Sequence, residues 1–100
     1  MFFFSYEVRP KQSHPKRDQY GGAFVNCWIL RDTQAQAEVV ARDWIVNEHW
    51  RITAVEEAFP MTRENQAEHP DGMRFFEQAE IDREVFALHV WPVGAPDSEP

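Results

Sequence analysis

The sequence is poor in cysteine and has no long apolar run. Its single cysteine, Cys27, cannot form an intrachain disulfide, so packing alone must hold the fold. A lone thiol suits a reducing compartment, and we expect a cytoplasmic location. The apolar N-terminus reaches only Glu7, well short of the roughly 20 apolar residues of a membrane span, and it lacks the basic start of a signal peptide. We therefore predict no membrane segment.

Basic residues are also scarce, since 10 Lys and Arg face 17 Asp and Glu, giving a net charge of −7. The balance is uneven: residues 1–31 hold five basic and two acidic groups (+3), and residues 32–100 hold five basic and fifteen acidic groups (−10). Such an acidic body repels phosphate backbones, which argues against nucleic-acid binding and would attract a basic protein partner. The simpler interpretation is that the charge keeps a small protein in solution.

Aromatic residues, in contrast, are abundant, with eight Phe and four Trp in 100 residues. This length and composition are those of one folded domain, because there is no repeat, linker or low-complexity tract. The sequence therefore predicts a single α+β domain over residues 1–93. Residues 94–100 are expected to form a disordered tail.

Four segments rich in β-branched and aromatic residues predict strands: 1–9, 23–31, 51–59 and 84–92. The segment 10–22 contains two prolines and a Gly-Gly pair, so we expect a long, mobile loop between the first two strands. Apart from Tyr20 it has no apolar anchor.

Two helices are predicted between these strands. Thr33 and Gln36 match a capping box, and the helix that follows to about residue 50 has an apolar stripe made of Ala37, Val40, Ala41, Trp44 and Ile45. Trp44 is its expected core anchor. A short turn is expected after Thr62. A second helix, capped by Asp71, is expected to reach about Arg83 and to face inward with Met73, Phe76 and either Ala79 or Glu80.

The order of these elements is ββαβαβ. It predicts a two-layer sandwich with both helices on one face of a four-stranded mixed or antiparallel sheet. This is a ferredoxin-like class of architecture, although the order differs from the usual βαββαβ.

Side chains alternate along strands, so each strand divides into two sets. The first set is almost wholly apolar and is the expected helix-covered core: Phe2, Phe4, Tyr6 and Val8; Val25, Cys27 and Ile29; Ile52 and Ala54; Phe86, Leu88 and Val90. The second set should face water, yet it also contains large apolar side chains, and a patch of this kind usually marks a contact site. We therefore predict an interface at Phe3, Phe24, Trp28, Leu30, Phe59 and Trp91.

The first function hypothesis follows from that surface and from the acidity. It is a non-enzymatic protein-interaction module, homodimeric through the second set and of immunity, antitoxin or inhibitor type. Two-fold homodimers are the commonest assembly, which favours a second copy as the occupant.

The alternative is a small-molecule-binding protein or a small enzyme that uses His89 and Glu57, which both fall in the second set. Cys27 has no neighbouring base and is expected to be a core residue. The four His have no metal-ligand spacing, so no metal and no cofactor is predicted. A cavity of roughly 300 Å³ or more lined by His89 would favour this alternative over the first hypothesis.

Overall fold

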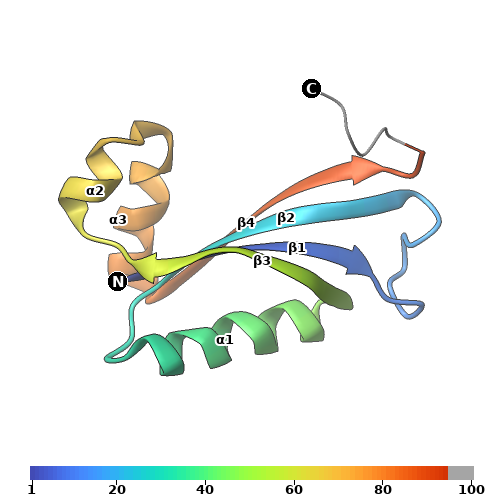
Figure 1. The fold of residues 1–100 in the computed structure, drawn as a ribbon, viewed down its shortest axis with the longest axis horizontal. Helices are drawn as coiled ribbons and strands as arrows, with labels where there is room; N and C mark the ends of the chain where they lie inside the picture. Colours follow the sequence, from blue (N-terminus) through green and yellow to red (C-terminus); the bar gives the residue numbers. More distant parts are fainter. Residues whose placement is uncertain (95–100) are drawn as a thin grey trace.

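A computed structural model describes residues 1–94 and consists of a four-stranded antiparallel sheet with helices on it (Figure 1). The strands are β1 (Phe2–Pro10), β2 (Tyr20–Ile29), β3 (Trp50–Pro60) and β4 (Glu84–Pro92), and their order across the sheet is β3-β1-β2-β4. The α+β class and four strands are thus as predicted. The ferredoxin-like order is matched only loosely, and the expected tail, apart from Gly94, lies outside the described residues.

The helical segments are α1 (Gln34–Asn47), α2 (Arg63–Ala67), the 3-10 turn η1 (Pro70–Gly72) and α3 (Met73–Asp82). Two N-termini are capped by threonine: Thr33 Oγ1 accepts from the Gln36 N–H, and Thr62 Oγ1 accepts from the Asn65 N–H, each at 3.1 Å. The prediction that Asp71 caps the second long helix is wrong. Asp71 lies inside η1, and α3 begins after Gly72 without a side-chain cap. Within residues 1–94 no helix has the length and apolarity needed to cross a bilayer.

β2 begins three residues earlier than predicted because its glycines are part of the strand. A Cβ on Gly22 would lie 2.5 Å from Cζ2 of Trp91, whose indole covers the backbone at this point. Glycine is required where a ring approaches the backbone so closely. A Gly-Gly pair usually ends a strand. In this protein the pair lies inside β2 and makes room for Trp91 of the neighbouring strand β4.

The first set of strand side chains forms the larger core, as expected, under α1. Phe4, Tyr6, Val8, Val25, Cys27 and Ile29 are buried there with Ala37, Ala41 and Ile45 of the helix. We call this side of the sheet the α1 face. Trp44 lies at its margin rather than at its centre: it is half-buried and stacks on Phe86 with ring centroids 4.3 Å apart. The apolar stripe of the helix is therefore assigned to the correct side.

The prediction that both helices lie on one face is wrong. Figure 1 shows α1 on one side of the sheet and α2 and α3 on the other, near the end where β3 finishes and β4 begins. A second cluster lies there, in which Phe76 and Ala79 of α3 and Met61 bury Phe3 and Trp28 of the sheet. We call this side the pocket face, for the cavity described below.

The connections explain why the helices are divided in this way. The chain from β2 to β3 must cross β1, and it does so through α1; the chain from β3 to β4 must pass from one edge of the sheet to the other, and it does so through α2, η1 and α3. Both sets of strand side chains are apolar at this end, so each crossing buries one of them. The sheet is covered on both sides here and on one side farther along.

Candidate functional site

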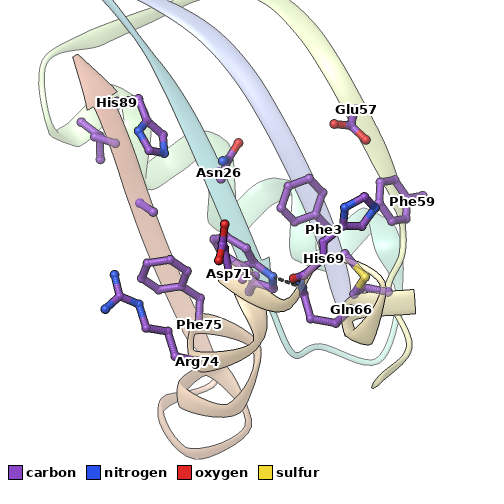
Figure 2. Close-up of a pocket in the computed structure, with 15 residues that line it drawn as sticks. Phe3, Asn26, Glu57, Phe59, Gln66, His69, Asp71, Arg74, Phe75 and His89 are labelled. Carbon is purple, nitrogen blue, oxygen red and sulfur yellow. Dashed lines mark hydrogen bonds between the residues drawn. The ribbon is translucent and has the colours of Figure 1, made fainter. Parts of the chain in front are cut away.

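A pocket of about 600 Å³ lies on the pocket face, beside the helical segment 63–82. Figure 2 shows that its lining comes from the strands on one side and from the α2–α3 segment on the other. This volume is within the usual range of small-molecule sites, roughly 300–1,000 Å³. The pocket is therefore large enough for a ligand, and it includes His89.

A row of small or polar residues crosses the sheet at the pocket, and three of its four members line the cavity. The strand register places Glu57, Ser5, Asn26 and Ala87 side by side, one from each strand. The neighbouring row, made of Phe59, Phe3, Trp28 and Val85, is bulky and lies beneath the helices. The pocket forms because α2 and α3 cover the bulky row but not the row of short and polar side chains beside it.

Aromatic rings form much of the pocket wall. Phe3 packs at 5.1 Å from Trp28 and at 5.4 Å from Phe59, and Phe75 of α3 lies 5.0 Å from Trp28 between ring centroids. Phe3 and Trp28 are buried, whereas Phe59 and Phe75 are partly open. Rings in such positions offer a planar ligand faces and edges on which to stack.

The helical wall is attached to the sheet by a buried hydrogen-bond chain. Trp28 Nε1–H donates to Gln66 Oε1 at 2.8 Å, and Gln66 Nε2 donates to the backbone carbonyl of His69 at 2.8 Å. Gln66 is 2% exposed, so its amide would be costly without these partners. Gly72 completes the attachment, since a Cβ at this position would lie 2.5 Å from Nε2 of Gln66. The α2–η1 segment is consequently fixed as a wall of the pocket.

Five polar side chains around the pocket have no partner within residues 1–94: Asn26, Glu57, His69, Asp71 and His89 form neither a side-chain hydrogen bond nor an ion pair there. A sixth, Arg74, places its guanidinium 4.7 Å from the ring centroid of Phe75. Polar side chains on the surface of a small fold commonly bind only water. These six, however, are grouped around one aromatic cavity (Figure 2). This combination can hold a ligand with an apolar plane and polar edges.

His89 and Glu57 both line this pocket, but they come from opposite edges of the sheet. Glu57 lies on β3 and His89 on β4, which are the two edges of the sheet. Three strand spacings separate them, or roughly 14 Å at the backbone. A general acid and a base that act on one bond must both be within hydrogen-bonding reach of it. This separation argues against a joint action of the two residues on one bond.

The residues of the predicted interface are divided by the structure. Phe3 and Trp28, expected to be exposed, are buried under α3 at 8% and 4% exposure, and Phe59 and Leu30 are partly buried. The reason is the crossing segment 63–82, which covers this end of the pocket face. Phe24 is 39% exposed and packs against Trp91 at 5.1 Å, with the guanidinium of Arg9 over Trp91. The open apolar surface is thus smaller than the sequence implied.

Two buried titratable groups lie on the α1 face, away from the pocket. Burial raises the pKa of Cys27 to about 12, so its thiol stays protonated and serves as core, as predicted. Burial also raises the pKa of Tyr6 to about 12, with a smaller contribution from Cys27. Neither residue lines the pocket. Within the described residues no cluster of three or more His, Cys, Asp or Glu has the arrangement of a metal site.

Sequence reasoning missed half of the pocket. His69, Asp71, Arg74 and Phe75 come from the segment between β3 and β4, which the sequence placed on the opposite face. One signal was present: on each of the first three strands the second set changes from a large aromatic residue (Phe3, Trp28, Phe59) to a polar one two positions away (Ser5, Asn26, Glu57). That change could have indicated that a helical segment covers only the aromatic part of this face and that a pocket lies where the cover ends.

Comparisons with known proteins give no match. The chain matches no family model, no curated protein and no solved structure. The pocket residues themselves are the observations from which a function can be inferred.

Proposed function

We propose that this protein binds a small organic molecule with an aromatic ring in the pocket beside α3. The observation that carries the proposal is the pocket itself: about 600 Å³, walled by aromatic rings and surrounded by polar side chains without partners in the described chain. This is the second of the two hypotheses raised by the sequence. The pocket supports this hypothesis because His89 lines a cavity of about 600 Å³, which exceeds the threshold of roughly 300 Å³ given above.

The polar groups favour a ligand that donates hydrogen bonds. Glu57 and Asp71 are acceptors when ionised, and Asn26 offers a carbonyl oxygen as well as an amide. Arg74 is the only side chain of the opposite permanent charge in the lining, and it lies against Phe75. An aromatic or heteroaromatic ring that carries amino groups therefore fits better than an aromatic acid.

Three probes test this chemistry: tryptamine, indole-3-acetate and cyclohexylamine. For a molecule of this size, ligand efficiency predicts a Kd on the order of 1 mM for tryptamine. We expect amide shifts in a ¹⁵N NMR titration at Asn26, Asp71, Phe75 and His89 with tryptamine. We expect weaker shifts with indole-3-acetate, which lacks the positive charge, and with cyclohexylamine, which lacks the ring.

Variants locate the binding. Phe75→Ala should weaken tryptamine binding roughly fivefold or more through the loss of one aromatic wall. Glu57→Gln should weaken the binding of tryptamine more than that of indole-3-acetate. Phe24→Ala is the matched control, because Phe24 is an exposed aromatic on the same face but outside the pocket. Shifts that are absent with all three probes, or that survive Phe75→Ala but not Phe24→Ala, would reject the proposal.

The protein-interaction hypothesis stays a proposal, and the exposed apolar surface that supports it is smaller than the sequence implied. Its support is the net charge of −7 and the exposed ring of Phe24, which packs on the partly buried Trp91, since Phe3 and Trp28 are engaged within the chain. An immunity, antitoxin or inhibitor role and a basic partner would rest on the acidity alone.

A further inference from the structure

Within residues 1–94, β4 forms one edge of the sheet and pairs only with β2, on its inner side. Between Glu84 and Pro92 it carries no charged residue, no proline and no glycine. Its register with β2 runs without irregularity from Ile29–Glu84 to Gly22–Trp91. A long, regular, uncharged edge of this kind is a template for a further strand.

The other edge of the same sheet is protected. β3 carries Arg51, Glu56 and Glu57, and its pairing with β1 is interrupted by two register shifts. Charges and bulges are the usual means by which proteins prevent edge-to-edge pairing. Between Val85 and Trp91 the β4 edge has neither a charged residue nor a register shift, so the contrast with β3 is specific to this stretch.

The register shows which β4 backbone groups face outward. The N–H of Leu30 donates to the carbonyl of Arg83 at 2.7 Å, so this opposed pair is hydrogen-bonded. Bonded and non-bonded pairs alternate in an antiparallel ladder, so Val85, Ala87 and His89 bond to β2. Phe86, Leu88 and Val90 must then direct their N–H and C=O groups away from the sheet.

We propose that β4 pairs with β4 of a second copy of this chain, antiparallel and with the two-fold axis at Leu88. In this register Leu88 lies opposite its own symmetry mate and Phe86 opposite Val90. The six outward N–H and six outward C=O groups of the two strands are then brought face to face. Side chains match in the same register, with large beside small: Phe86 with Val90 on the α1 face, and Trp91 with Val85 on the pocket face. A strand that complements itself in this way favours a second copy as its occupant.

The helices leave this edge accessible. α1 packs on β1, β2 and β3, and α3 packs on β4 and β2, on opposite faces of the sheet. The one carboxylate at the start of β4, Glu84, is paired with Arg31 at 2.5 Å. The repulsion between two copies therefore comes from the net negative charge of the rest of the surface. Added salt screens this repulsion and should strengthen the dimer. The proposal does not depend on ligand binding in the pocket.

The test compares two matched valines. Val90 on β4 and Val55 on β3 are exposed by 41% and 50% and lie on opposite edges. We expect the unmutated protein to dimerise in sedimentation velocity between about 5 and about 500 µM, more strongly at higher salt. Val90→Lys should raise the dimer dissociation constant roughly tenfold or more, because it places two lysines in the paired edge. Val55→Lys should change it less than about twofold.

Amide exchange on the unmutated protein gives an independent reading. In the dimer the amides of Phe86, Leu88 and Val90 should be protected, and dilution should expose them, while those of Val85, Ala87 and His89 stay protected throughout. Fast exchange at 86, 88 and 90 in a protein that is monomeric across the whole range would overturn the proposal. A dimer that Val55→Lys disrupts and Val90→Lys does not would overturn it as well.

Discussion

At the scale of single residues, the imidazole of His14 packs the loop between β1 and β2 onto aromatic rings of the sheet. The His14 ring lies 4.5 Å from Trp50 and 5.7 Å from Tyr20, and those two rings are themselves stacked at 6.2 Å. Beside it Ser13 Oγ is 3.0 Å from His49 Nδ1. The sequence offered Tyr20 as the only apolar anchor of this loop, because Trp50 is thirty residues further along. The mobility predicted for the loop stays a prediction.

The environment of His14 makes this attachment pH-dependent. Burial lowers the pKa of His14, and nearby His49 and Lys16 lower it further, against a smaller opposing effect of Glu48. The neutral ring is favoured in the folded state, so its contribution to stability is complete above the unfolded pKa of about 6.5 and is lost as the pH falls below that value. We expect the free energy of unfolding in urea to fall more between about pH 7.5 and about pH 5 in the unmutated protein than in His14→Gln. Equal pH dependence in the two proteins would contradict this assignment.

At the scale of elements, α1 is the segment that the sequence predicts best. Its apolar residues recur with helical spacing, and Thr33 caps it as the capping box requires, although the reciprocal bond from the Gln36 side chain is not formed in the described chain. What the sequence could not decide was where α3 packs. Alternation separates the strand side chains into two sets, but with Phe4 and Tyr6 in one and Phe3 and Trp28 in the other, both sets are apolar enough to attract a helix. Topology, not hydrophobicity, makes that choice.

The two threonine caps give a prediction at this scale. Thr33→Ala should lower the free energy of unfolding by about 1 kcal/mol, because the Gln36 N–H loses its acceptor at the start of a fourteen-residue helix. Thr62→Ala removes the same kind of bond from α2, which has five residues. We expect α2 to fray locally there, with a smaller effect on global unfolding. Urea denaturation of both variants measures the difference, and equal effects would show that α2 unfolds with the rest of the domain.

At the scale of the whole molecule, β1 and β2 contribute side chains to both hydrophobic clusters. Ile45 is buried in one cluster and Phe76, at 4% exposure, in the other. We predict that Ile45→Ala and Phe76→Ala each cost about 2–5 kcal/mol and that both variants still unfold in one transition. Coincident curves from circular dichroism and tryptophan fluorescence would establish this. Ile81→Ala is the control, since Ile81 is 76% exposed and should be nearly neutral. A Phe76→Ala variant that loses α3 while the α1 face stays native would show two independent units.

The place of β1 and β2 at the centre of the sheet has a consequence for how the chain is made. These strands leave the ribosome as a local hairpin before the strands that flank them, because β3 and β4 begin about thirty and sixty residues after the start of β2. Until then the hairpin exposes both edges and two apolar faces, including Phe3 and Phe4 on opposite sides. Non-local pairing of this kind is slow and prone to aggregation. The nascent chain should therefore need shielding by a chaperone until β3 emerges to cover one edge, and again until β4 closes the other.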